Sequence, residues 1–190
     1  MSTATDVVTT PSGRTLDGLV PGVWTVDTSH SEVGFTARHL MVSKVRGRFT
    51  DYTATITIAP NVLDSTVQAV VQLDSVDTRD EKRDGHLRSA DFFDVAKFPQ
   101  ITFQSRSVKR TGEQSADVTG DLTMHGRTRP IVLHVQLLSG ASGDRSRWKV
   151  TTAPLKRRDF DLVFGGTAEA VSGIGQDVAV RIEIEANRHQ

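Results

Sequence analysis

Cysteine is absent from the 190 residues of this sequence. Its absence excludes thiol catalysis, disulfide redox chemistry and cysteine-ligated zinc sites. Net charge is absent too, because 23 basic residues balance 23 acidic ones. The two signs are mixed along the chain, which argues against electrostatic binding to nucleic acid or to an anionic membrane surface. An uncharged or lipidic ligand is still compatible with this composition.

Long apolar runs are missing as well. No stretch approaches eighteen apolar residues, and no positively charged leader precedes an apolar segment. We therefore expect a cytoplasmic protein without an integral membrane segment. Residues 1–17 are rich in Ser and Thr and are predicted to form a flexible tail, because they have too little apolar surface to offset ordering entropy. A chain of this length fits one domain, predicted over residues 18–190.

The dominant pattern in the chain is an alternation of apolar and polar residues with a period of two. In segment 178–186 one face carries the apolar set Val178, Val180, Ile182 and Ile184. Such alternation is typical of strands with one buried face, and it recurs in eight to ten segments separated by turn residues. The connections are too short for the crossover helices of a parallel sheet. An all-β antiparallel barrel or sandwich remains, and a closed barrel is favoured because it leaves no exposed edges.

One segment departs from this pattern, and residues 79–90 are predicted to form a short helix. Thr78 and Glu81 have the spacing of a capping box, and Gly85 in the middle favours a length of two to three turns. Leu87, Phe92 and Phe93 are expected to dock the helix on the barrel as a lid or plug. Its charged side chains are expected to remain in water.

Motifs for catalysis or metal binding are lacking. The six histidines show neither the HxH nor the HxxxH spacing of common metal sites. No GxSxG elbow, GxGxxG loop or GxxxxGK[ST] loop occurs, and the glycines of 165–175 are interpreted as a hairpin at the barrel rim. We therefore expect no metal site, no catalytic residues and no cofactor.

Two polar residues end apolar rows when strand alternation is extended to them. His39 falls on the same side as Val33 and Phe35, and Arg158 on the same side as Phe160 and Leu162. Both are candidates for the mouth of a barrel. The alternatives are a core histidine bonded to the backbone and an arginine that reaches solvent from a strand end.

Four segments together resemble the YceI family, the YceI-like lipid or polyisoprenoid-binding proteins. They are WTVDTSHSEVGFTARHLMVSKVRGRF (24–49), VDTRDEKRDGHLRSADFFDVAKFPQITFQS (76–105), VTGDLTMHGRTRPIVLHV (118–135) and LKRRDFDL (155–162). The resemblance covers residues 22–187 and implies an extended, eight-stranded, lipocalin-like antiparallel barrel whose apolar cavity holds a long isoprenoid or fatty chain. Two features depart from the family: many members carry a secretory signal, and Asp161 replaces a frequent glycine, although Asp accepts positive φ less readily.

The resemblance and the alternation together imply a non-enzymatic protein that binds, transports or stores a long apolar lipid, such as a polyprenyl chain or an isoprenoid quinone. The expected cavity lining is Trp24, Val26, Val33, Phe35, Ile101, Phe103, Leu122, Leu133, Val135, Phe160, Leu162, Phe164, Val180 and Ile182. The head group is expected near His39, Arg158 or His86. A homodimer is compatible with the sequence. The alternatives are a lipid-modifying enzyme that uses Asp84 or His86, and a stress-linked interaction protein with a filled barrel.

Overall fold

The computed structural model describes residue 16 and residues 18–39, 43–139, 143–163 and 174–189. Twelve strands form one sheet in these residues. Their bounds are β1 Gly22–Val26, β2 Glu32–His39, β3 Ser43–Phe49, β4 Tyr52–Ile58, β5 Thr66–Gln72, β6 Val76–Asp77, β7 Gln100–Arg110, β8 Ser115–Met124, β9 Arg127–Ser139, β10 Arg145–Thr151, β11 Leu155–Lys156 and β12 Ile174–Arg188. The helices are α1 Glu81–Arg88 and the 3₁₀ turns η1 Thr28–His30, η2 Val62–Asp64, η3 Leu73–Ser75 and η4 Arg157–Phe160. No helix in these ranges is long and apolar enough to cross a membrane.

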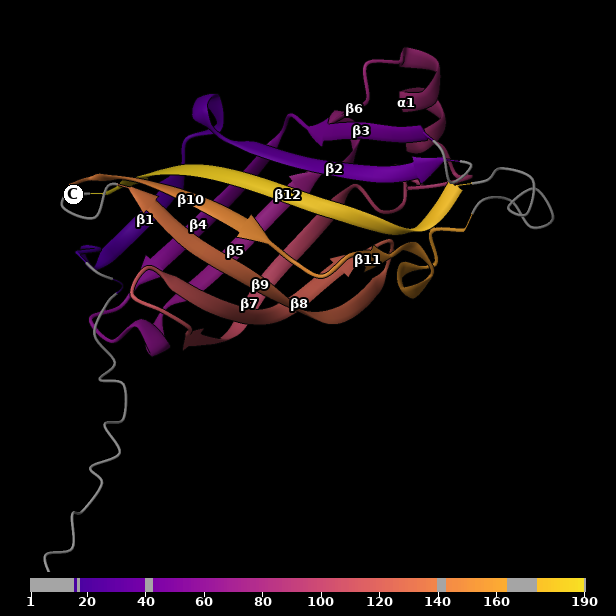
Figure 1. Ribbon diagram of the computed structural model, residues 1–190. Coiled ribbons are helices and arrows are strands. Elements are labelled where there is room, and N and C mark those ends of the chain that lie inside the picture. Colours follow the sequence, from indigo (N-terminus) through magenta and orange to yellow (C-terminus); the bar gives the residue numbers. More distant parts are fainter. Residues whose placement is uncertain (1–15, 17, 40–42, 140–142, 164–173, 190) are drawn as a thin grey trace, which may run out of the picture.

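The sheet closes into a barrel. Neighbouring strands pair in the order β1, β4, β5, β7, β8, β9, β10 and β12, and β12 pairs back with β1. Every pairing is antiparallel, so the described residues form the expected all-β, eight-stranded closed barrel with one α-helix. The barrel is elongated, with the long strand β12 running along it and α1 near one end (Figure 1).

A second group of strands extends the wall on the side of α1. β12 pairs with β2 over Val178–Glu183 and with β1 over Ala186–Arg188, so β2 and β1 follow one another along the same edge of β12. β3 pairs with β2, and the short β6 pairs with β3. Helix α1 follows β6 directly in the chain, which places it beside this end of the barrel (Figure 1).

The predicted alternation appears directly in the burial of the strands. In β8 every second residue from Ala116 to Met124 is buried, and in β10 the buried positions are Ser146, Trp148 and Val150. Because successive side chains of a strand point to opposite faces, these strands present one apolar face to the barrel interior. The same alternation in β12 places Val180, Ile182 and Ile184 on the interior side.

The N-terminal boundary differs in one detail from the expected domain organisation. Leu16, assigned to the flexible tail by composition, is 2% exposed and belongs to the core. The packed domain therefore includes at least this residue. The remaining residues of the expected tail lie outside the described part of the chain.

The start of α1 differs from the capping-box prediction. The N-cap residue is Asp80, whose carboxylate accepts a hydrogen bond from the backbone N–H of Arg83 at 3.0 Å. Arg79 adopts a positive φ of 61°, so the chain turns sharply between Thr78 and the helix. Thr78 is buried and lies between the end of β6 and this turn, so it is not the N-cap. The prediction of a Thr78–Glu81 capping box was therefore wrong. The helix ends at Arg88, within the expected range, with Ser89 as its C-cap.

Candidate functional site

An apolar cavity lies inside the barrel. Its inner lobe has a volume of about 240 Å³ and is lined by side chains from all eight strands of the closed barrel. Ten predicted lining residues surround this lobe: Val26, Val33, Phe35, Ile101, Phe103, Leu122, Leu133, Val135, Val180 and Ile182. The inner lobe therefore forms a surface suited to hydrocarbon.

A larger outer lobe, with a volume of about 660 Å³, adjoins the inner lobe and is bordered by residues of α1. Two further predicted lining residues, Phe160 and Leu162, contribute to the outer lobe. The residues shared by both lobes are Phe35, Phe49, Ile101, Met124, Leu155 and Val180. Since these side chains border both lobes, the two lobes are adjacent.

Two predicted lining residues have other outcomes. Trp24 is 1% exposed, lies outside the lining and packs in the core, where its indole N–H donates to the carbonyl of Val20 at 3.2 Å. A period of two identifies an inward side chain but cannot separate filled core from cavity wall. Phe164 lies outside the described residues.

The sequence reasoning missed several lining residues, among them Phe49, Met124 and Trp148. Trp148 borders the inner lobe, and its indole N–H donates to the Ser146 hydroxyl at 2.8 Å. Each of the three occupies a buried position of an alternating strand. Applying the alternation to every strand, rather than to selected ones, could have identified them.

Glycine shapes the cavity wall at a cross-strand pair. Gly47 on β3 lies opposite Phe35 on β2, and a Cβ added at Gly47 would stand 2.8 Å from Phe35 Cε1. The Phe35 ring therefore lies over the Gly47 backbone, in space that any other residue would occupy. Because Phe35 borders both lobes, this close approach fixes part of the cavity wall.

Tyr52 supplies a phenol to the lining of the inner lobe. Burial raises the pKa of this hydroxyl, and the charges of Glu32 and Asp27 raise it further. The phenol is consequently neutral at physiological pH, and the inner lobe carries no charged side chain among its described lining residues.

Four aromatic rings connect the segment after α1 with the cavity wall. Phe92 and Phe93 meet edge to face with centroids 4.9 Å apart, and Phe93 lies 6.3 Å from Phe49, which lies 5.5 Å from Phe35. Backbone hydrogen bonding folds this segment back, since the N–H of Phe93 donates to the carbonyl of Leu87 at 3.0 Å. Leu87, Phe92 and Phe93, the residues predicted to form a lid or plug, all border the outer lobe.

The mouth residues predicted by alternation differ from those in the structure. Arg158 is exposed and lies outside the cavity lining, whereas its neighbour Arg157 is 3% exposed and borders the outer lobe. Residues 157–160 form the 3₁₀ turn η4 instead of a strand, so the period of two does not apply there. The placement of Arg158 at an inward-facing mouth was therefore wrong. Arg157 holds the turn in place by donating from Nε to the carbonyl of Gly175 at 3.0 Å.

The two histidine candidates are placed differently. His86 is half-buried on α1 and borders the outer lobe, with Nε2 3.8 Å from the Asp91 carboxylate. His39 ends β2, where its backbone lies opposite Ser43 of β3. The side chain of His39 lies outside the described residues.

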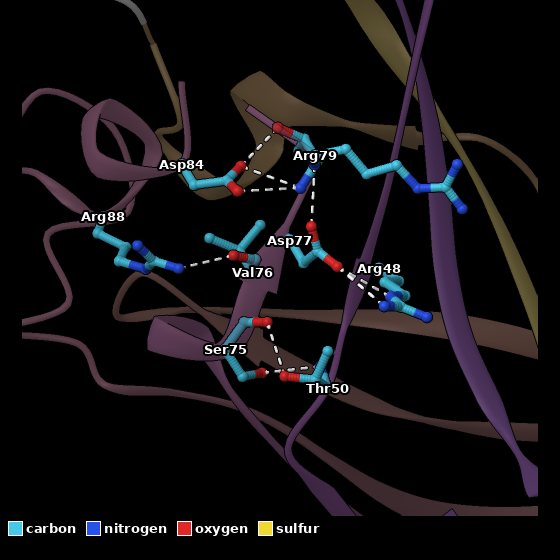
Figure 2. Close-up of polar contacts among 9 residues, drawn as sticks. Arg48, Thr50, Ser75, Val76, Asp77, Arg79, Asp84 and Arg88 are labelled. Carbon is cyan, nitrogen blue, oxygen red and sulfur yellow. Dashed lines mark hydrogen bonds and ion pairs between the residues drawn. The ribbon is translucent and has the colours of Figure 1, made fainter. Parts of the chain in front are cut away.

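Polar contacts tie α1 to strand β6. The carboxylate of Asp84 accepts hydrogen bonds from the backbone N–H and the hydroxyl of Thr78, and Arg88 donates to the carbonyl of Val76 at 2.8 Å. Figure 2 shows Asp84 and Arg88 directed toward the β6 segment. Asp84 is 6% exposed, so the expectation that all charged side chains of the helix remain in water was wrong.

A second set of contacts ties β6 to β3. Arg48 donates from Nε to the Asp77 carboxylate at 3.0 Å, and the backbone N–H of Arg79 donates to the other oxygen of that carboxylate (Figure 2). The Arg79 N–H and the Arg48 guanidinium hold the pKa of Asp77 below its ordinary value. The helix is thus connected through β6 to the barrel wall.

Metal-binding geometry is not seen in the described ranges. No group of three His, Asp or Glu side chains there could hold a metal ion. Asp84, one candidate acid of the enzyme alternative, is hydrogen-bonded to Thr78 and does not border either lobe. The arrangement is that of a binding cavity with an apolar interior and a polar rim.

The chain resembles known proteins in both sequence and structure. The YceI-like domain matches residues 24–186. Protein YceI of Escherichia coli O157:H7 is 38% identical over 138 residues, which are 70% of this chain and 71% of that protein. The crystal structure of the Campylobacter jejuni YceI protein superposes with a TM-score of 0.67 at 30% identity, covering 87% of this chain and 97% of that one.

A third similar structure is that of a domain named for the ligand class it binds. The polyisoprenoid binding domain from Saccharophagus degradans has a TM-score of 0.66 at 24% identity, covering 87% of this chain and 98% of that one. At this identity the likeness concerns the fold. The domain match and the E. coli and C. jejuni relatives establish the family, and the chain belongs to the YceI-like family.

Proposed function

We propose that this protein binds and shields a long apolar lipid, of the polyisoprenoid type, as a non-enzymatic carrier or store. The observation that carries the proposal is the pair of adjacent lobes in the barrel, the inner of which is lined almost wholly by apolar side chains. The outer lobe alone falls within the roughly 300–1,000 Å³ typical of ligand pockets.

The shape and lining of the cavity favour a chain over a compact ligand. Two adjacent lobes along an elongated barrel suit a slender molecule, and each methylene removed from water contributes about 0.8 kcal/mol before ordering costs. Isoprenoid chains are long and branched, with little polarity along their length. The description of the S. degradans domain as polyisoprenoid binding supports the same ligand class for this chain.

Two observations favour binding over the alternatives. The buried Asp84 faces Thr78 instead of the cavity. The side chain of Asp91, whose carboxylate lies near His86, is 74% exposed to solvent. Neither pair provides an acid and a base directed at a bound chain. A cavity of this size also argues against a filled barrel that acts only through its outer surface.

Extraction of the purified protein with organic solvent, followed by mass spectrometry, tests the proposal. We expect a co-purified long-chain lipid, or saturable binding of geranylgeraniol by the lipid-free protein. Trp148 borders the inner lobe, so its fluorescence should change when a chain enters. Absence of any bound or bindable long-chain lipid would contradict the proposal. Chemical conversion of the lipid by the protein would replace it with the enzyme alternative.

A further inference from the structure

The outer lobe differs from the inner lobe in its charge. Five Lys or Arg side chains border it among the described residues, and Asp80 is the one carboxylate. The cations are Arg38, Lys82, Arg83, Lys156 and Arg157. The polar rim of the cavity is therefore predominantly positive.

Two of these cations are committed to the protein. Arg83 lies 3.5 Å from the Asp80 carboxylate and donates to the hydroxyl and the carbonyl of Thr78. Arg157 is buried and donates to the carbonyls of Gly175 and Leu162. Their N–H groups are therefore already engaged by oxygen atoms of the protein itself.

Three cations remain, and they come from three elements around the lobe. Arg38 belongs to β2, Lys82 to α1 and Lys156 to β11. All three are exposed, and none has an ion-pair partner in the part of the chain that the structure describes. Asp177 lies opposite Lys156 in the β11–β12 register but lies outside the lining and forms no ion pair with it.

We propose that this rim selects lipids with an anionic head group, a carboxylate or a phosphate on the end of a long apolar chain. The inference rests on the proposed function, because the chain must occupy the cavity for its head to reach the rim. The apolar inner lobe would receive the tail, which leaves the polar end in the outer lobe. Low-dielectric walls around charges of one sign focus their electric field, which raises the local concentration of oppositely charged ligands.

Two lipids that share the same apolar chain but differ in their head group test the inference. Binding of geranylgeranyl phosphate and of geranylgeraniol to the lipid-free full-length protein is measured by Trp148 fluorescence. We expect the phosphate to bind about tenfold more tightly at low ionic strength. The preference should shrink severalfold in about 0.5 M salt, where the Debye length is only a few ångströms.

Matched double variants locate the effect. Lys82→Gln with Lys156→Gln removes two rim charges and should abolish most of the preference for the phosphate over the alcohol. Lys109→Gln with Lys149→Gln removes two exposed charges of β7 and β10 that lie outside the lining, and should keep the preference. Because both double variants change net charge equally, a general charge effect would move them together and would overturn the inference.

The outcomes separate the inference from the proposed function. Equal affinity of the wild-type protein for both lipids would overturn the selectivity for an anionic head group and leave the carrier function standing. Failure of both lipids to bind would overturn the two together. Inorganic phosphate serves as a third ligand: if it bound as tightly as the lipid phosphate, the rim would be a site for free anions, and the lipid-head assignment would be wrong.

Discussion

Asp84 of α1 and Thr78 of the preceding turn form a buried polar pair, with the Thr78 backbone N–H 3.0 Å from one carboxylate oxygen. The hydroxyl of Thr78 donates to the same oxygen and in turn accepts from Nε of Arg83 at 2.7 Å. Removal of the carboxylate would leave a buried N–H without its acceptor. This pair is therefore a main connection between the helix and the barrel.

Substitution Asp84→Ala is expected to lower the free energy of unfolding by about 1–3 kcal/mol, the usual cost of a buried donor left unsatisfied. Chemical denaturation measures the change. Glu81→Ala is the matched control on the same helix, because Glu81 is exposed and should change stability by less than about 0.5 kcal/mol. Equal effects of the two substitutions would show that the buried pair contributes nothing special.

Gly47 in the cavity wall and Gly85 on α1 are expected to respond to alanine with opposite changes in stability. Gly47→Ala should force the Phe35 ring from its position, narrow the cavity, weaken lipid binding and destabilise the fold by about 1–3 kcal/mol. Gly85→Ala on α1 meets no atom within 4 Å and should stabilise the protein by up to about 1 kcal/mol. Thermal unfolding and lipid titration of both variants check the prediction. Unchanged lipid affinity in Gly47→Ala would contradict the role of this close approach.

Asp161, where the sequence departs from the motif it resembles, stands in the left-handed region with φ 54°. Its carboxylate pairs with Nε of Arg127, and both side chains are about half exposed. Asp161→Gly relieves backbone strain of about 1 kcal/mol but loses an exposed ion pair worth about 0.2–1 kcal/mol. We expect stability between unchanged and slightly increased.

Arg127→Ala separates the two contributions, because it removes the ion pair and leaves the strain. It should lower the free energy of unfolding by no more than about 1 kcal/mol. A clear loss of stability in Asp161→Gly, larger than that in Arg127→Ala, would mean that the Asp161 side chain stabilises the fold through more than this ion pair.

Hydrogen exchange distinguishes a movable lid from a fixed seal. If α1 and the segment through Phe93 open to admit lipid, the amides of residues 79–93 should exchange more slowly in the lipid-bound protein than in the lipid-free one. β8, which pairs with strands on both sides, serves as the internal reference. The same protection of residues 79–93 in both states would identify a fixed seal, despite the cavity beneath it.

Much of the cavity wall follows from local pattern. Val33, Phe35 and Val180 were identified as inward-facing from alternation alone, since the direction of a strand side chain is set by its own backbone. The expectation failed at Arg158, where a 3₁₀ turn replaces the strand, and at Thr78, where the positive φ of Arg79 moves the N-cap to Asp80. Both failures concern short turns, whose dihedral angles a period of two does not encode.

The sequence by itself therefore determined the strands, their inward faces, the helix and the resemblance to the YceI family. Tertiary structure alone decided that Trp24 fills the core while Trp148 borders the cavity, because both are inward-facing and differ only in what packs against them. It also decided the burial of Asp84 and the gathering of Arg38, Lys82 and Lys156 around one lobe. Those three cations are far apart in the chain, and the closure of the barrel with its attached helix brings them to the same rim.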